Sequence, residues 1–305
     1  MNSQVHAPFV LGNSLAQPMA RPLPSIPLRA MLRSLSGLRA GVAIPLALLG
    51  LMLLCALVPS LIAPYGPMDM DGNALLQAPS GTHILGTDHL GRDVFSLVVH
   101  GARQSIMVAA SAVVVGLSLG GLIGLITGYV GGWVDGLFMR VLEVWLAIPD
   151  ILLVIALATA LRPSLTNMIL TIGIVSVPRY ARVMRAQVMA IKHRPFVEAS
   201  RAIGASDFSI LRGHILPHSL SPMLVLATLG IANAAQMGAA LSFIGLGVVD
   251  DIPDWGFLLS QAQSYLTVAW WFGAFPGLAI TTLAIGVNVL GNSLRQKLDP
   301  RAKTR

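Results

Sequence analysis

Glu198-Ala-Ser-Arg-Ala-Ile-Gly204, followed by Leu216-Pro217, is a polar stretch that lies between long apolar segments. It carries two charges, and a charge in the middle of a membrane costs about 2.5–3.5 kcal/mol on insertion scales. The stretch is therefore expected to face water. Gly204 and Pro217 divide it into two short helical pieces, which favours a docking surface over an unstructured linker.

Composition indicates an integral membrane protein. The chain has 305 residues, of which 55% are hydrophobic and 11% charged, and its mean hydropathy is +0.75. Soluble globular proteins carry about 25% charged residues. The net charge of +7 does not indicate nucleic-acid binding, because the basic residues cluster beside apolar segments, as topology signals do. The single cysteine, Cys55, excludes an internal disulfide.

Six apolar segments are long enough to cross a membrane, and they predict an all-α, polytopic membrane helix bundle with six transmembrane helices. We expect a cytoplasmic tail at 1–39, the first transmembrane helix at 40–63, a periplasmic loop at 64–100, a core transmembrane domain at 101–294 and a cytoplasmic tail at 295–305. Within the core, spans are expected at 104–130, 138–161, 165–185, 220–246 and 271–293, with a cytoplasmic polar segment at 192–218.

The distribution of basic residues predicts the orientation of these spans. Six spans place both termini on one side, and sixteen of the 20 lysine and arginine residues fall on that side. The two opposite loops contain only Arg92 and Arg103, against seven aspartates. The positive-inside rule therefore predicts cytoplasmic termini and a cytoplasmic Glu198 stretch. The loop residues expected on the outer surface include Asp250, Asp251 and Asp254.

Glycines recur at every fourth position of the second span, as Gly116, Gly120, Gly124 and Gly128. This spacing lines one helix face with hydrogen side chains and lets another helix backbone approach closely. Tight packing inside the bundle is the main interpretation. The alternative is a smooth face that slides during gating.

Two carboxylates in the third span leave a second function open. Glu143 and Asp150 lie seven positions apart and would share one face of an ideal helix. A proton-coupled secondary transporter would use such a pair. The other interpretation places both near the cytoplasmic end of the span, in water or paired with Arg140, with Pro149 marking a helix break.

The sequence contains no pattern typical of a catalytic or metal site. Neither G-x-x-x-x-G-K-[ST] nor H-E-x-x-H occurs, so no phosphate loop and no zinc site of that type is expected. His83 and His89 stand near Asp88 and Asp93, but their spacing matches no standard metal site. The serines of the polar stretch lack a His/Asp arrangement for nucleophilic catalysis. We therefore expect no catalytic residue, no metal and no cofactor.

Local signals predict two helices in the polar segment. Pro195 can start the first, because its missing N–H would be unpaired there, and Glu198 then lies in the first turn. Gly204 can end this helix in a left-handed conformation. Ser206 or Asp207 can cap the second helix.

The second helix carries an apolar stripe formed by Phe208, Leu211 and Ile215, which needs a partner surface. Pro217 is expected to end the helix before the fifth span. A short amphipathic helix of this kind is suited to a groove on a soluble subunit. The residues expected to form the docking surface are Glu198, Ala199, Ser200, Gly204, Ala205, Ser206, Asp207, Leu216 and Pro217.

The stretch resembles the EAA loop of binding-protein-dependent ABC importer permeases, which reads Glu-Ala-Ala, three residues, Gly, then nine or ten residues to an apolar residue and Leu-Pro. The matching residues are Glu198, Ala199, Gly204, Leu216 and Pro217. Ser200 replaces the second alanine, and His214 stands where the pattern usually has isoleucine.

Four further stretches resemble the dipeptide/oligopeptide/nickel permease family, and in particular its second, C-type subunit. They are His83-Ile-Leu-Gly-Thr-Asp-His-Leu-Gly-Arg-Asp-Val-Phe-Ser96, Gly131-Gly-Trp-Val-Asp135, Leu241-Ser-Phe-Ile-Gly-Leu-Gly247 with Trp255-Gly256, and Leu290-Gly-Asn-Ser-Leu-Arg295 with Leu298-Asp-Pro-Arg301. Together with the EAA-like loop, the resemblance covers residues 40–301.

The resemblance implies a non-catalytic permease subunit in the lipid of the bacterial inner membrane that imports dipeptides, oligopeptides or a related small solute. It also implies a heterodimer with a paralogous permease, two cytoplasmic ATP-binding subunits and a periplasmic solute-binding protein. The loop around Gly204 would couple ATP hydrolysis on the partner subunits to alternating access. The alternatives are the proton-coupled transporter and a membrane scaffold or insertase-like protein without a cargo.

Overall fold

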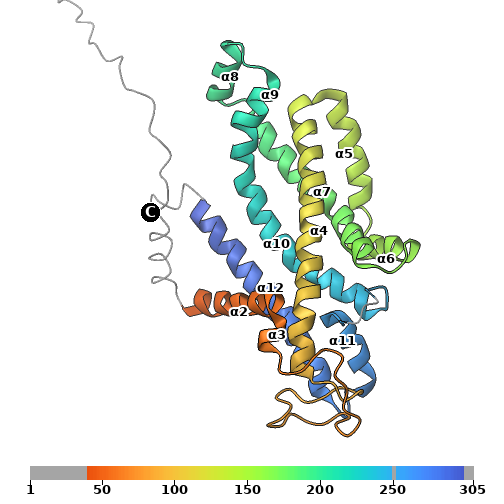
Figure 1. The fold of residues 1–305 in the computed structure, drawn as a ribbon. Helices are drawn as coiled ribbons and strands as arrows, with labels where there is room; N and C mark the ends of the chain where they lie inside the picture. The colour runs from red at the N-terminus through yellow and green to blue at the C-terminus, as the bar shows by residue number, and fades with distance from the viewer. Residues whose placement is uncertain (1–39, 249–251, 299–305) are drawn as a thin grey trace, which may run out of the picture. The chain divides into compact units, whose positions relative to one another are not determined.

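A computed structural model describes residues 40–248 and 252–298, and over these residues the chain is mostly α-helical and contains no β-strand (Figure 1). The predicted tail at 1–39, the chain beyond residue 298, and Asp250 and Asp251 lie outside the described residues. The helices are α2 (Ala40–Leu57), α3 (Pro59–Ile62), α4 (Val94–Val130), α5 (Gly132–Leu146), α6 (Asp150–Ala160), α7 (Leu165–Ile191), α8 (Pro195–Ala202), α9 (Asp207–Ile210), a π turn (Leu211–Ile215), α10 (Leu216–Phe243), α11 (Trp255–Ala262), a 3₁₀ turn (Gln263–Tyr265) and α12 (Trp270–Leu298).

Among the described residues, three helical stretches are long and apolar enough to cross a membrane: α4, Asp207–Phe243 and Trp270–Gln296. They correspond to the second, fifth and sixth predicted spans. α4 begins at Val94, well before the predicted start at Gln104. Its 37 residues extend over about 55 Å. The helix therefore projects beyond a hydrocarbon core of about 30 Å.

The third predicted span is two helices rather than one. α5 and α6 meet at an angle of 89° across residues 147–149. Pro149 disfavours helix at the residue before it and has no N–H of its own, which explains the break. Of the two interpretations of Glu143 and Asp150, the helix break at Pro149 is confirmed, whereas the shared helix face is wrong, because the two residues lie on opposite sides of the bend.

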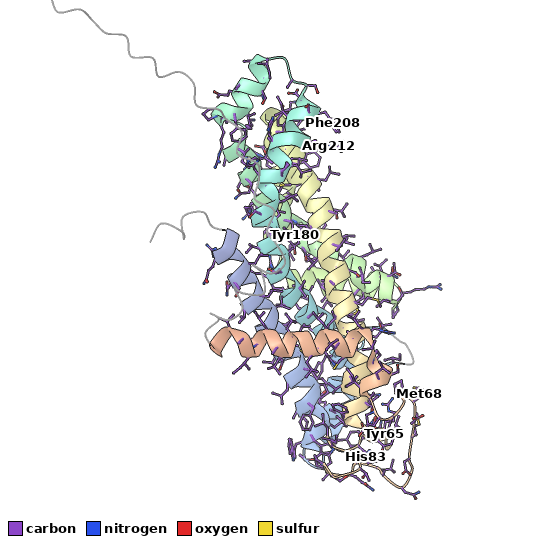
Figure 2. The ribbon with its side chains drawn as sticks, turned by 60° about the vertical axis from the view of Figure 1, so that its left-hand side comes forward. Tyr65, Met68, His83, Tyr180, Phe208 and Arg212 are labelled. Carbon is purple, nitrogen blue, oxygen red and sulfur yellow. The ribbon has the colours of Figure 1, made fainter. Side chains whose placement is uncertain are left out.

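The first predicted span is also shorter than expected. α2 ends at Leu57, and Pro59 begins the short helix α3. Figures 1 and 2 show α2 running across α4 rather than alongside it. Arg103 of α4 donates from Nε to the Ala56 carbonyl at 2.9 Å and from Nη2 to the Leu57 carbonyl at 2.9 Å. Its charge thus caps the negative end of the α2 dipole.

α4 and α7 run in the same direction and pack closely along the glycine face of α4. A Cβ atom on Gly116 would lie 2.9 Å from the carbonyl oxygen of Gly173, and one on Gly124 would lie 2.7 Å from Cβ of Met184. The same face carries Gly120 and Gly128, which lie against Val177, Tyr180 and Val188 of α7. The contact leaves no room for a side chain on this face of α4.

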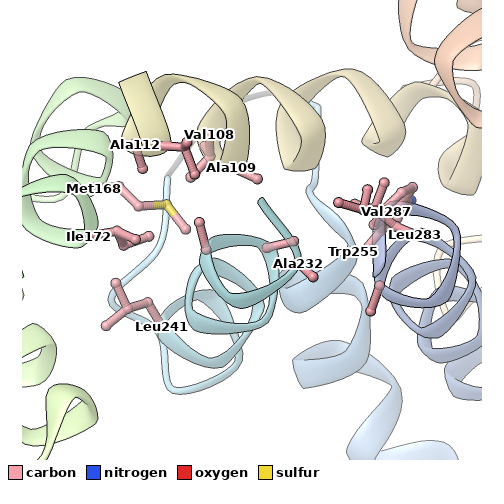
Figure 3. Close-up of a cluster of buried hydrophobic side chains, with 14 of the residues drawn as sticks. Val108, Ala109, Ala112, Met168, Ile172, Ala232, Leu241, Trp255, Leu283 and Val287 are labelled. Carbon is pink, nitrogen blue, oxygen red and sulfur yellow. The ribbon is translucent and has the colours of Figure 1, made fainter. Parts of the chain in front are cut away.

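Buried apolar side chains of α4, α7, α10, α11 and α12 form one cluster (Figure 3). In Figure 3, Val108 and Ala112 of α4 lie opposite Met168 and Ile172 of α7, with α10 beside both. Trp255 of α11 is 1% exposed. Its indole N–H donates to the Val98 carbonyl of α4 at 2.9 Å, so its polar atom is satisfied inside the core.

The histidine- and aspartate-containing motif before α4 builds a compact loop. Asp88 accepts hydrogen bonds from the backbone N–H of Arg92 at 2.8 Å and from its Nε at 2.7 Å. Asp93 caps α4 by accepting from the Ser96 N–H at 2.8 Å, and His83 Nδ1 lies 3.1 Å from its other oxygen. These side chains therefore serve local structure, and within the described residues no three candidate ligands are grouped around a metal position.

Asp254 is buried, which contradicts the expectation that it lies on the accessible outer surface. The residue is 7% exposed. Its carboxylate caps α11 by accepting from the Phe257 N–H at 2.9 Å, and it accepts from the Ser242 hydroxyl at 2.6 Å. Burial raises the pKa of Asp254 above its usual value. Asp254 thus links the start of α11 to the end of α10 through hydrogen bonds.

Gly124→Ala should lower the stability of the protein, because the new Cβ would meet Met184 and the backbone of α7. Overpacking at such a contact costs about 1–3 kcal/mol. Gly121→Ala is a matched control on the same helix, where a Cβ meets nothing within 4 Å. Thermal unfolding in detergent should give a lower Tm for Gly124→Ala only. Equal Tm values for the two variants would contradict the close approach of α4 and α7.

Candidate functional site

The polar segment, residues 192–218, connects α7 to α10 through α8 and α9. It lies at the end of the bundle opposite to the loop before α4. Figure 2 shows Phe208 and Arg212 at one end and Tyr65, Met68 and His83 at the other. The two ends are therefore available to different partners.

α8 begins at Pro195, as predicted, and Glu198 lies in its first turn. A carboxylate is favoured there by the positive end of the helix dipole. Val197 is completely buried, whereas Glu198 and Ala199 are exposed. α8 is thus anchored by an apolar side chain and directs its polar face outward.

A tight turn joins α8 to α9. Gly204 adopts a left-handed conformation with φ of 86°, and its N–H donates to the Arg201 carbonyl at 3.0 Å. Most side chains are strained at such a φ, although no atom lies within 4 Å of a Cβ placed there. Ser206 caps α9 by accepting from the Ser209 N–H at 3.3 Å. The predicted helix start, left-handed glycine and serine cap are confirmed.

Two large apolar side chains beside this turn remain exposed: Ile203 is 86% exposed and Phe208 is 71% exposed. We call these two residues the tip. The predicted apolar stripe is only partly available, because Ile215 is completely buried and Leu211 is half-buried. Apolar side chains grouped at one exposed place are typical of an interaction site.

Pro217 does not end the helix, contrary to the prediction, since α9, the π turn and α10 form one continuous helical stretch. A proline within a helix clashes with the carbonyl four residues earlier and donates no hydrogen bond. The π turn widens the helix just before Pro217. His218 Nδ1 bonds the His214 carbonyl at 2.6 Å, and the Ser219 hydroxyl donates to the Ile215 carbonyl at 2.9 Å. Phe208 of the tip is therefore in helical continuity with α10, whereas Ile203 lies on the other side of the Gly204 turn, at the end of α8.

The two departures from the EAA pattern contact each other. Ser200 Oγ lies 3.1 Å from His214 Nε2. The same hydroxyl donates to the Phe196 carbonyl at 2.9 Å, and the Phe196 ring stacks on His218 with centroids 5.2 Å apart. A serine–histidine hydrogen bond thus stands where the pattern has alanine and isoleucine, and it joins α8 to the π turn.

Polar contacts between residues far apart in the sequence join the ends of α4, α5 and α7 next to the polar segment. Arg185 of α7 forms a bidentate ion pair with Asp135 of α5, in which Nη2 lies 2.6 Å from Oδ2. Lys192 Nζ lies 3.1 Å from the Tyr129 carbonyl at the end of α4. Sequence reasoning missed these residues, because the partners are 50 and 63 positions apart and no local pattern relates them.

Glu143 and Asp150 do not form a shared proton site. Asp150 Oδ2 lies 3.0 Å from Nη2 of Arg179 on α7, rather than beside Arg140 as expected. Glu143 is exposed on the other side of the bend. The pairing of Asp150 connects α6 to α7 and removes the structural support for a proton relay.

Membrane-length helices that carry an exposed polar segment at one end define the chain as a polytopic membrane protein. Residues 120–304 match the family described as binding-protein-dependent transport system inner membrane component. The chain belongs to this family, whose members are the permease subunits of ABC importers. It is thus an inner-membrane, non-catalytic subunit of a transport complex with other ABC subunits, and ATP hydrolysis resides in its partners.

Several relatives are similar over most of their length. The probable D,D-dipeptide transport system permease DdpC of Escherichia coli is 40% identical over 252 residues, which cover 83% of this chain and 85% of the relative. The dipeptide permease DppC of Alkalihalophilus pseudofirmus is 40% identical over 266 residues, 85% of this chain and 87% of the relative. The glutathione permease GsiD of Pectobacterium atrosepticum is 37% identical over 269 residues, 88% and 89% of the two chains. A solved amino acid ABC transporter with histidines is 18% identical, with a TM-score of 0.48 over 69% of this chain and 95% of that chain.

Proposed function

We propose that this chain is the permease subunit that carries dipeptides, oligopeptides or a related small solute through the membrane, delivered by a periplasmic binding protein. The observation that carries the proposal is the 40% identity to DdpC and DppC over 83% and 85% of this chain. The names of these relatives and of GsiD all specify small peptides as cargo. A small peptidic solute is the class common to them.

The proposed complex contains a paralogous permease as heterodimer partner, two cytoplasmic ATP-binding subunits and the binding protein. In it, this chain crosses the membrane six times with both termini in the cytoplasm. The concentration of sixteen of 20 basic residues on one side of the predicted spans supports this orientation. The polar segment then faces the ATP-binding subunits, and the loop before α4 faces the binding protein.

The proposed coupling surface comprises the EAA-like residues and the tip. Ile203 and Phe208 would enter a groove on an ATP-binding subunit, and closure of the ATP-binding subunits would displace the turn around Gly204. Because Phe208 lies on the helix that continues into α10, displacement of this part of the tip would move a membrane-spanning helix directly. The assignment of Glu198, Ala199, Ser200, Ala205, Asp207, Leu216 and Pro217 to this surface rests on the same argument.

Proteoliposomes that contain the whole complex should accumulate a labelled dipeptide only when ATP is present on the side of the ATP-binding subunits and the binding protein on the other. Uptake should persist when a protonophore collapses the proton gradient, because no proton relay is used. Uptake that needs the gradient and not ATP would contradict the proposal in favour of the proton-coupled alternative. ATP hydrolysis without any solute dependence would favour the scaffold alternative.

Gly204→Val should uncouple ATP hydrolysis from uptake, because a β-branched residue is strained at a φ of 86°. A left-handed conformation costs about 1–2 kcal/mol for an ordinary residue, so dipeptide transported per ATP should fall about tenfold. Gly204→Asn is the matched control, because asparagine tolerates this conformation. The assay is the transport-to-hydrolysis ratio in proteoliposomes after co-purification confirms assembly. Equal ratios for both variants would contradict the role of this turn.

The proposed topology predicts opposite labelling of the two ends of the bundle. In a Cys55→Ala background, a membrane-impermeant maleimide applied to intact spheroplasts should modify Val268→Cys, which is 66% exposed between α11 and α12. Ile203→Cys should react only after the membrane is permeabilised, although Ile203 is 86% exposed. The reverse pattern would show that the tip faces the periplasm and would exclude contact with ATP-binding subunits.

A further inference from the structure

α4 meets the polar segment at the end of the bundle, although the two are far apart in sequence (Figure 1). The chain joins the segment directly to α7 on one side and to α10 on the other. A displacement of the segment therefore reaches those two helices through the backbone. It reaches the end of α4 through side-chain contacts, and these centre on Tyr129.

The Tyr129 side chain bridges the two helices of the segment. Its hydroxyl donates a hydrogen bond to the carboxylate of Asp207, the first residue of α9. Arg201, in the last turn of α8, places Nη2 3.5 Å from the same phenolic oxygen. One hydroxyl group thus contacts both sides of the turn that contains Gly204.

The backbone of Tyr129 is held as well. Lys192, just after α7, donates from Nζ to the carbonyls of Tyr129 at 3.1 Å and Gly128 at 3.4 Å. The ring of Tyr129 is half-buried and packs against the apolar core. Hydrogen bonds to ionised groups are stronger than neutral ones, so contacts with a carboxylate, a guanidinium and an ammonium group fix this residue firmly.

We propose that Tyr129 is a positioning residue for energy coupling: its hydroxyl fixes the turn that carries Ile203 and Phe208 to the end of α4. A displacement of the tip then moves the closely packed α4–α7 pair together with α10. Without the hydroxyl, the tip side chains are unchanged and still dock, but the turn loses its direct link to α4, which then follows the segment only through α7 and Lys192. The inference rests on the proposed coupling role of the polar segment.

The test uses the whole complex of this chain, its partner permease, the ATP-binding subunits and the binding protein in proteoliposomes. Tyr129→Phe keeps the ring and removes the hydroxyl. We expect dipeptide transported per ATP to fall about fivefold, the change that loss of one ordinary hydrogen bond produces in an equilibrium constant. The ATPase rate and the co-purification of the subunits should not change. Asp207→Ala removes one of the two partners of that hydroxyl and should also lower the ratio. The effects of the two variants should be less than additive, because both remove the Tyr129–Asp207 bond.

Thr127→Val is the matched control, since it removes a hydroxyl of α4 that donates within the same helix, to the Ile123 carbonyl at 2.9 Å. Its transport-to-hydrolysis ratio should equal that of the unmodified complex. An unchanged ratio for Tyr129→Phe, while Gly204→Val uncouples, would overturn the role of Tyr129 and leave the proposed function intact. Unchanged ratios for both would overturn both. Loss of co-purification in Tyr129→Phe would also overturn the inference, because the residue would then serve assembly.

Discussion

The close approach of α4 and α7 is the contact on which the rest of the structure depends. Apolar helices surrounded by lipid gain little from burying apolar surface against each other, so close packing of small residues has to hold them together. Glycines at every fourth position of α4 supply that packing over four turns. Because the two helices run in the same direction, the intervening chain must return along the bundle, and α5 and α6 provide this return as a bent pair.

Several aspartates of the described segments lie where helices begin. Asp93 and Asp254 cap α4 and α11, and Asp150 starts α6 and pairs with Arg179. At these places free backbone N–H groups and helix dipoles stabilise a carboxylate, and ion pairs offset its removal from water. Asp150, which the sequence left open as a proton carrier, is therefore better explained as the start of α6 and as its link to α7.

Local sequence signals predicted local structure well and tertiary contacts poorly. Pro195, Gly204 and Ser206 act through the backbone of their own turn, so their roles were readable from residue type and spacing. The prediction that Pro217 ends the helix was wrong, because the π turn before it accommodates the proline ring within the helix. Asp254 was placed on the surface, although its burial depends on Ser242 and on helices that pack around it. The Tyr129–Asp207 contact joins residues 78 positions apart, and no single-sequence pattern reports such a pair.

A polar segment between two spans can be an unstructured connector or a helical extension of a span, and the two differ in whether the helix continues from the segment into the span. Here the helix runs from Asp207 to Phe243 without interruption. The π turn at Leu211–Ile215 is the one irregular stretch within it. Ser200 of α8 contacts His214 inside the π turn, and Phe196 of α8 stacks on His218 just after it. The departures from the EAA pattern therefore link α8 to the turn that precedes Pro217, and the part of the segment from Asp207 onward is built as an extension of α10 rather than as an unstructured linker.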